Sequence, residues 1–369
     1  MNFKEALNTA KLVIMTKEVP LLIGESGIGK TSLVREISRK LDYKMITIDA
    51  NLLKEGEIGG LPVVSDIDVK EGEKIKKRKI TTYAIHNKLV EVDDAIKNNE
   101  KVLLFIDELN RCEHAVQQEL MNLVLNREIN GYKLSHEVSI IAAMNPSNKY
   151  ESYEDSNYQV VDMDPAQENR FVWINMESDL KQWLSWAMGK GEIHSHIIEF
   201  LSSFPEYLNV TESGESIRAT PRSWERVSKA YKVYESLEEV SFDTLYNVVK
   251  GNVGVSIAQD FISYVKSIKK PLVNFKEIIK DGVLTFDTKE IIKNENHSRL
   301  YILAKNGLNI LEDLNNEEAI NIFSEVLSLY PRDLRLGIMK EIKIDASKEL
   351  YSKILDNDKF LEAFFNIYD

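Results

Sequence analysis

The stretch Gly24-Glu25-Ser26-Gly27-Ile28-Gly29-Lys30-Thr31 has the spacing G-x-x-x-x-G-K-[ST] of a phosphate-binding loop. The apolar run Pro20–Ile23 precedes it and predicts a buried strand, and residues 30–41 follow with helical spacing. In this setting the glycines let the backbone turn so that amide N–H groups point at phosphate oxygens at the start of a helix. The sequence therefore predicts a nucleotide site, with Lys30 at the β- and γ-phosphates and the Thr31 hydroxyl as an Mg²⁺ ligand.

The residues predicted to contact the nucleotide are Gly24, Glu25, Ser26, Gly27, Ile28, Gly29, Lys30, Thr31 and Ser32. Because so short a motif also occurs by chance in glycine-containing turns, a metal-binding carboxylate on a neighbouring strand is needed to support it. Val102–Ile106 is apolar at every position, as a strand covered on both faces requires, and Asp107 and Glu108 follow it directly. Asp107 is predicted to bind Mg²⁺, directly or through water, and Glu108 to orient and polarise the attacking water. The plain alternative for this acidic pair is a helix cap.

A third polar position follows the strand that is predicted over residues 138–144. Asn145 comes directly after this strand and before Pro146. At the carboxyl edge of a parallel sheet its side chain would lie between the first strand and the acidic strand, within hydrogen-bonding reach of the γ-phosphate or of the attacking water. An isolated Asn-Pro is also an ordinary turn signal, which is the alternative interpretation.

The predicted element types change near residue 176. Before it, apolar strands alternate with helices, which predicts an α/β fold with a doubly wound parallel sheet and helices on both faces. After it the strand signal fades and apolar residues recur at helical spacing, for example in a capped helix that begins at Asn316 and ends before Pro331. We therefore expect a nucleotide-binding core over residues 1–176, a helical domain over 177–270 and a further, mainly helical region over 271–369.

Composition limits the class of protein. The 369 residues are more than one compact core usually contains, and the chain is 43% hydrophobic and 29% charged, as in ordinary soluble proteins. The formal net charge of −12 argues against a general nucleic-acid binder, although a local basic pore is compatible with it. The single cysteine, Cys112, allows no internal disulfide. Together with the lack of a membrane-length apolar run and of an apolar signal segment after Met1, it favours a cytoplasmic protein without a membrane span.

The three motifs together resemble those of the AAA+ ATPases, and more narrowly those of the MoxR-like branch. Beyond the loop and the acidic strand, the resemblance rests on a trailing Asn-Arg, a helix and β-hairpin before sensor 1, sensor 1 itself, and a loop inserted in the second helix. The corresponding segments are Asn110-Arg111, Val116–Met121, Asn130-Gly131, Ala143–Pro146 and Gly59–Pro62. The resemblance covers residues 18–230 and implies an AAA+ core with a helical lid over 177–270, and ATP with Mg²⁺ as cofactors. The C-terminal region lies outside it.

Two arginines correspond to family positions. Arg170 resembles the arginine finger, which reaches the γ-phosphate of a neighbouring subunit, although the family more often has Asp where Asn169 stands here. The alternative is a surface arginine at the start of a strand. The tripeptide Thr220, Pro221 and Arg222 resembles sensor 2 at the start of a lid helix, with Thr220 as the cap, Pro221 at the first helical position and Arg222 directed at the nucleotide. The alternative is a simple capped helix with an exposed arginine.

The resemblance implies an ATPase that forms a homo-oligomeric ring, a hexamer on ATP binding, and that remodels or assembles a protein partner in a chaperone-like way. MoxR-like proteins often act with a von Willebrand factor A-type partner, and the acidic composition fits a protein client better than nucleic acid. The alternative is a DNA-directed motor or the NTPase subunit of a restriction or defence system, with the basic run Lys74–Lys79 and the hairpin near Asn130 lining a pore. A GTPase switch is disfavoured because the sequence has no Asn-Lys-x-Asp motif, and a kinase because Glu108 suits water activation.

Other polar residues receive plainer interpretations. Residues 70–80 are densely charged and mostly basic, which is typical of a solvated loop or hairpin, with a positive lip on a pore or a partner surface as the functional alternative. Arg111 is a candidate for a subunit interface, and Arg127 and Lys133 are weaker candidates. The histidines, including those of His194-Ser195-His196, complete no zinc motif and are interpreted as structural or surface residues.

Overall fold

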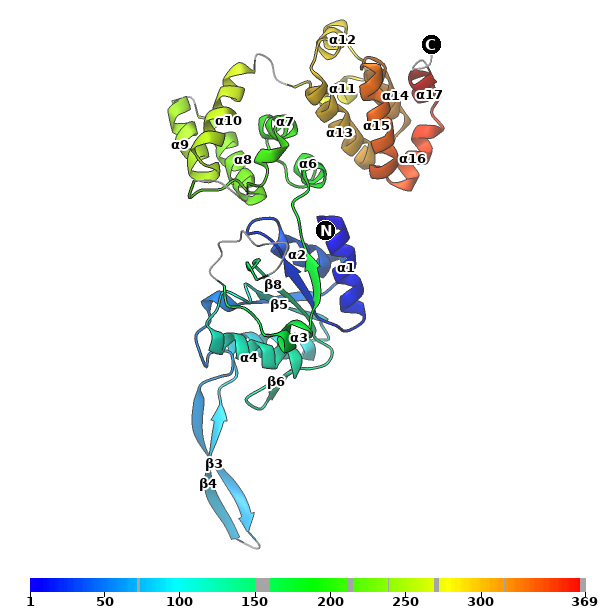
Figure 1. The fold of residues 1–369 in the computed structure, drawn as a ribbon. Coiled ribbons are helices and arrows are strands. Elements are labelled where there is room, and N and C mark those ends of the chain that lie inside the picture. The colour runs from blue at the N-terminus through cyan, green and yellow to red at the C-terminus, as the bar shows by residue number, and fades with distance from the viewer. Residues whose placement is uncertain are drawn as a thin grey trace. The chain divides into compact units, whose positions relative to one another are not determined.

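The computed structural model describes residues 1–71, 74–149, 160–210, 215–237, 239–268, 272–314 and 316–365. The chain divides into two compact units, Met1–Ser178 and Asp179–Asp369. The first unit contains the sheet and the second is built from helices (Figure 1). The three domain ranges expected from the sequence stay predictions.

A five-stranded parallel sheet in the order β2-β5-β8-β1-β9 forms the centre of the first unit. The expected α/β fold, with helices on both faces of a doubly wound parallel sheet, is confirmed. The strands of this sheet are β1 Pro20–Ile23, β2 Lys44–Asp49, β5 Val102–Asp107, β8 Ser139–Met144 and β9 Val172–Asn175. The helices of the unit are α1 Phe3–Met15, α2 Lys30–Leu41, the 3-10 turn η1 Ala50–Leu52, α3 Asn87–Lys97, α4 His114–Leu125 and α5 Pro165–Glu168.

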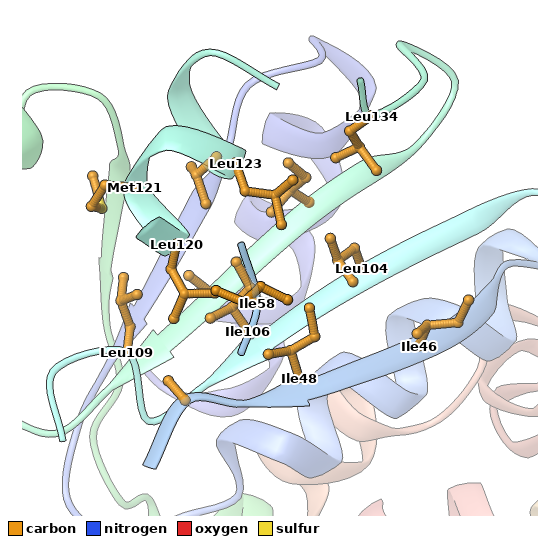
Figure 2. Close-up of a cluster of buried hydrophobic side chains, with 14 of the residues drawn as sticks. Ile46, Ile48, Ile58, Leu104, Ile106, Leu109, Leu120, Met121, Leu123 and Leu134 are labelled. Atoms are coloured by element: carbon orange, nitrogen blue, oxygen red, sulfur yellow. The ribbon is translucent and has the colours of Figure 1, made fainter. Parts of the chain in front are cut away.

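Strand β5 shows why the sheet needs cover on both faces. Successive side chains of a strand point to opposite faces, and every residue from Val102 to Ile106 is buried. Leu104 and Ile106 pack in the cluster that includes α3 and α4, which Figure 2 shows with Leu120 of α4. Leu103 and Phe105 pack in the cluster that includes α1 and α2. The continuous apolar run of the sequence therefore follows from burial on two sides.

A long antiparallel hairpin is inserted between β2 and α3 and extends away from the sheet (Figure 1). Its strands are β3 Pro62–Glu71 and β4 Lys74–Tyr83. The side chains of residues 77–79 are exposed, as predicted for this charged run, whereas residues 72 and 73 lie outside the described residues. At the base of the insertion, Asn130 donates a hydrogen bond to the carbonyl of Gly59 (2.9 Å).

Asn130 belongs to the predicted tight turn, which joins β6 Glu128–Ile129 to β7 Tyr132–Lys133.

The second unit contains two apolar clusters. The first cluster surrounds the fully buried Phe200, Trp224 and Phe261, and the second surrounds Phe275 and Phe323, whose rings meet edge to face. Asn316 caps α14 as predicted, because its side chain accepts from the backbone N–H of Ala319 (2.8 Å). The helices of the first cluster are α6 Leu180–Met188, α7 Ser195–Ser203, η3 Pro205–Tyr207, α8 Pro221–Glu235, α9 Phe242–Val253 and α10 Val255–Ser267. They are followed by α11 Phe275–Asp281, α12 Phe286–Lys293, α13 His297–Leu314, α14 Glu317–Ser328, α15 Arg332–Asp345, α16 Lys348–Leu355 and α17 Asp358–Phe365.

Candidate functional site

The glycine-containing loop joins β1 to α2, as the sequence predicts. Gly29 is the N-cap of α2 with φ +108°, a left-handed conformation that strains residues with a Cβ atom. Gly24 lies so close to the end of β9 that a Cβ atom there would stand 2.8 Å from the carbonyl oxygen of Met176. The loop therefore has a fixed path that only glycine allows at these two positions, and it leads into the N-terminus of a helix, where backbone N–H groups attract anions.

Lys30 is the first residue of α2, directly after the loop, and is 9% exposed. Its ammonium donates to the carbonyl oxygens of Gly24 (2.5 Å) and Glu25 (3.1 Å). It also donates to the side-chain oxygen of Asn145 (3.0 Å), which comes from the end of β8. The structure thus brings the first and third sequence motifs into direct contact.

The acidic motif joins them at the end of β5. The Thr31 hydroxyl donates a hydrogen bond to Asp107 Oδ2 (3.1 Å). The other oxygen of the same carboxylate accepts from the backbone N–H of Glu108 (3.0 Å). A hydroxyl and a carboxylate oxygen at this distance are oxygen donors of the kind that Mg²⁺ binds.

Glu108 stands at a strained turn just after β5. Its φ is +53°, a conformation that residues other than glycine rarely adopt and that is common at functional sites. The next residue is fixed by a backbone hydrogen bond from Leu109 N to the carbonyl of Ala143 (2.9 Å). The partly exposed Glu108 carboxylate forms an ion pair with Arg111 (3.3 Å). The backbone therefore holds a carboxylate at the edge of the sheet, beside the metal-type oxygens.

Asn145 is held by a residue to which the sequence assigned no role. Asn110, 2% exposed, donates from Nδ2 to the carbonyl of Asn145 (2.8 Å) and accepts from its backbone N–H (3.2 Å). The amide nitrogen of Asn145, Nδ2, is buried and has no hydrogen-bond partner among the described residues. Because buried polar atoms normally have a partner, this nitrogen fits an acceptor that a bound group would supply. The Asn-Arg that trails the acidic pair was the only signal for Asn110.

Arg170 and Arg222 come later in the sequence than the residues of this group. Arg170 is exposed in the first unit, between α5 and β9, and has no ion pair within the described part of the chain. Arg222 is exposed in the first turn of α8, in the second unit. The predicted cap of that helix is confirmed: Thr220 accepts from the backbone N–H of Ser223 (3.1 Å), and Pro221 is the first helical residue. The roles of both arginines stay predictions.

The sequence suggested Arg127 as a weak candidate for a subunit interface, whereas the structure shows contacts within the fold. Its guanidinium donates to the carbonyls of Ser135 and Val138, both at 2.6 Å, and burial lowers its pKa. These bonds tie the end of α4 to the segment that enters β8. Arg127 therefore stabilises the fold locally, whereas Lys133 is exposed.

Residues 20–162 match a family model, the AAA domain of the dynein-related subfamily. The match spans the glycine loop, the acidic pair and Asn145, and it ends before Arg170 and Arg222. Among curated proteins no relative matches this chain. Among the described residues, no helix is both long enough and apolar enough to cross a membrane.

Solved structures with which the chain aligns include NtrX from Brucella abortus in complex with ADP. It is 12% identical with a TM-score of 0.40, and the alignment covers 92% of this chain and 67% of that one. A point mutant of RuvB from Thermotoga maritima is 15% identical with a TM-score of 0.32, and the alignment covers 75% of this chain and 74% of that one.

Proposed function

We propose that this chain, whose residues 20–162 match the AAA domain, is an Mg²⁺-dependent ATPase that forms a ring and remodels a protein partner. The observation that carries the proposal is the contact of three motifs that are far apart in the sequence. Lys30 bonds Asn145, and Thr31 bonds Asp107, so that the loop, the acidic strand and the sensor-like residue form one group.

The residues fit ATP and Mg²⁺ by their chemistry. The N-terminus of α2 and the Lys30 ammonium supply positive charge for the phosphates. Thr31 and Asp107 would hold the metal ion, which when bound draws charge from the phosphate oxygens. The unpartnered amide nitrogen of Asn145 would donate to a phosphate oxygen or to the attacking water.

Glu108 is the residue that we assign to water activation. Its carboxylate follows the metal-type carboxylate of Asp107 directly, and the strained turn fixes the backbone that carries it. A carboxylate in this position would orient the water and accept its proton. Arg111, which pairs with Glu108, holds this carboxylate in one direction until the nucleotide is in place.

Ring assembly would complete the site. The exposed Arg170 would act as the finger in a neighbouring subunit of a hexamer, where it stabilises the charge of the transition state. Arg222, in the first turn of α8, would act as sensor 2 and couple nucleotide binding to the helical lid. The resemblance to MoxR-like proteins supports a chaperone-like role with a von Willebrand factor A-type client.

Charge favours a protein client over DNA. The net charge is −12, and the inserted hairpin pairs acidic with basic positions: Asp66 stands opposite Lys79, and Asp68 opposite Lys77. A surface for nucleic acid would carry basic charge with little acidic compensation. The single cysteine, Cys112, is buried and unpaired, which supports a reducing cytoplasm as the place of action.

Glu108→Gln tests the proposal. We expect the variant to bind ATP with unchanged affinity and to hydrolyse it roughly a thousandfold more slowly, because positioned general bases contribute about a hundredfold to ten-thousandfold. Affinity is measured with a fluorescent ATP analogue, turnover by phosphate release, and assembly by gel filtration with and without ATP. Glu113→Gln, an exposed acid five residues further on, is the matched control and should keep full activity.

Three outcomes would contradict parts of the proposal. Normal turnover in Glu108→Gln would remove the base assignment. A monomer under every nucleotide condition would remove the finger in trans. Salt-dependent DNA binding by the wild-type protein, with ATPase activity that DNA stimulates, would favour the motor interpretation over the protein client.

A further inference from the structure

Three side chains with metal-binding atoms meet in the second unit, away from any sequence motif. They are His194, the N-cap of α7, His196, in the first turn of α7, and Glu235, the last residue of α8. One ligand atom from each lies within 4.8 Å of the other two. The two histidines are partly buried and Glu235 is exposed, so the group opens to solvent on one side.

Neighbouring residues fix the two imidazoles. His196 Nδ1 lies 2.8 Å from the hydroxyl of Tyr231, which is 3% exposed, and the ring centroids of His194 and Tyr231 are 4.5 Å apart. The backbone N–H of His194 donates to the hydroxyl of Ser228 (2.8 Å), which ties the start of α7 to the middle of α8. In metal sites the ring nitrogen that does not bind the ion typically has a hydrogen-bond partner, and Tyr231 is placed to be that partner for His196.

We propose that His194, His196 and Glu235 bind one divalent transition-metal ion, best matched by Zn²⁺. Two imidazole nitrogens and one carboxylate are a common zinc ligand set, and a water molecule completes four-coordination. Ions that prefer only oxygen ligands, such as Mg²⁺ and Ca²⁺, fit less well. The bound ion would clip the start of α7 to the end of α8.

A metal ion binds the neutral form of each imidazole, because only that form has a free lone pair on a ring nitrogen. The ammonium of the neighbouring Lys232 donates a hydrogen bond to the backbone carbonyl of Glu192.

The proton positions identify what the ion displaces. Without metal, His194 Nδ1 accepts the cap hydrogen bond from the backbone N–H of His196 (3.2 Å), which places the ring proton on Nε2, where it is donated to Glu235 Oε2 (2.8 Å). Metal binding at Nε2 moves the ring proton to Nδ1, and the cap bond is lost. That bond is long, and its loss is small beside the coordination that replaces it.

The test uses the full chain without an affinity tag, stripped of metal with EDTA and free of nucleotide. Zn²⁺ is titrated by calorimetry and Co²⁺ by visible absorbance. We expect one ion per chain with a dissociation constant of about 10 µM or tighter. Glu235→Gln, at an exposed position, should weaken binding at least about tenfold, and so should His194→Asn, which keeps a capping side chain in place of the imidazole.

Two controls separate this site from other histidines and from the nucleotide site. His297→Ala removes an exposed histidine of the same unit, and Asp107→Asn removes the carboxylate proposed for Mg²⁺. Both variants should bind Zn²⁺ as the wild type does. The proposal is overturned if the wild type binds no ion at 100 µM Zn²⁺ (about ten times the expected constant). It also fails if Glu235→Gln and His194→Asn bind normally, or if Asp107→Asn abolishes binding.

Discussion

Buried charged side chains occur in both units, but their partners differ. In the first unit the Lys30 ammonium is held by two backbone carbonyls and an amide oxygen. In the second unit Arg299, also largely buried, lies 3.5 Å from the fully buried carboxylate of Glu199 and 3.2 Å from that of Glu295. Tyr264 donates a further hydrogen bond to Glu199 (3.4 Å).

The two sets of contacts serve different purposes. The contacts of Lys30 with oxygens of uncharged groups hold its ammonium in place, where its positive charge can attract an anion. Arg299 and Glu199 lie together inside the protein, where α13 packs against α7, and each offsets part of the cost of burying the other's charge, although burial still raises the pKa of the Glu199 carboxyl. Substitutions at these positions should therefore change different properties.

Lys30→Ala should have the largest effect. Two charge-assisted hydrogen bonds to phosphate oxygens contribute about 3–4 kcal/mol, so we expect ATP affinity to fall by roughly a hundredfold to a thousandfold. The free energy of unfolding of the second unit should stay unchanged. Calorimetric titration of the variant with Mg-ATP measures the loss, and unchanged affinity would refute the assignment of the loop.

Glu199→Ala should lower the free energy of unfolding of the second unit and leave ATP affinity unchanged. Removing this carboxylate leaves the buried Arg299 with one acidic neighbour fewer, and breaking such a pair typically costs about 3 kcal/mol. Three of the four tryptophans, Trp183, Trp186 and Trp224, lie in the second unit, so their fluorescence during urea unfolding reports the loss. Glu199→Gln keeps the shape of the side chain and should cost less. A second unit of normal stability in Glu199→Ala would show that the pair is dispensable.

The elements that the sequence predicted correctly have strong local patterns. The sheet strands are short apolar runs, and the glycine loop and the acidic pair are fixed by residues a few positions apart, so the motif and its setting are visible together. Asn316 and Thr220 were recognisable as caps for the same reason. Parallel topology followed from the alternation of strands and helices.

The features that the sequence did not predict depend on contacts between distant segments. The clamp between Asn110 and Asn145 joins residues that are 35 positions apart. The cluster of His194, His196 and Glu235 needs the packing of α7 on α8, and no local spacing encodes it. The structural role of Arg127 was equally hidden, because burial of a side chain cannot be read from its type alone.

The thiol of Cys112 is a chemical probe of local opening in the first unit, as tryptophan fluorescence is a probe of unfolding in the second. Burial raises the pKa of its thiol to about 11, and its sulfur donates to the carbonyl of Leu109 (3.3 Å). Because the thiolate is the reactive form, alkylation at pH 8 should be about a hundredfold slower than in the unfolded chain. The rate should keep rising with pH up to about 11, since the raised pKa delays ionisation. Iodoacetamide labelling followed by mass spectrometry measures it, and rapid labelling at pH 8 would mean that the acidic strand opens easily.

Arg111→Gln should have the smallest effect on activity. It tests whether Arg111 restrains the Glu108 carboxylate within one chain or lies at the contact between subunits. The Arg111–Glu108 ion pair is partly exposed, and exposed pairs contribute up to about 1 kcal/mol, so releasing the carboxylate should change the basal ATPase rate by less than about fivefold, in the upward direction. Phosphate release at low protein concentration, where assembly is minimal, measures this rate. Arg39→Gln removes an arginine from another exposed ion pair, with Glu36 on α2, and should leave the rate unchanged. A large fall in activity that appears only at concentrations where the ring forms would instead assign Arg111 to the contact between subunits, and the carboxylate of Glu108 would then be controlled from across that contact.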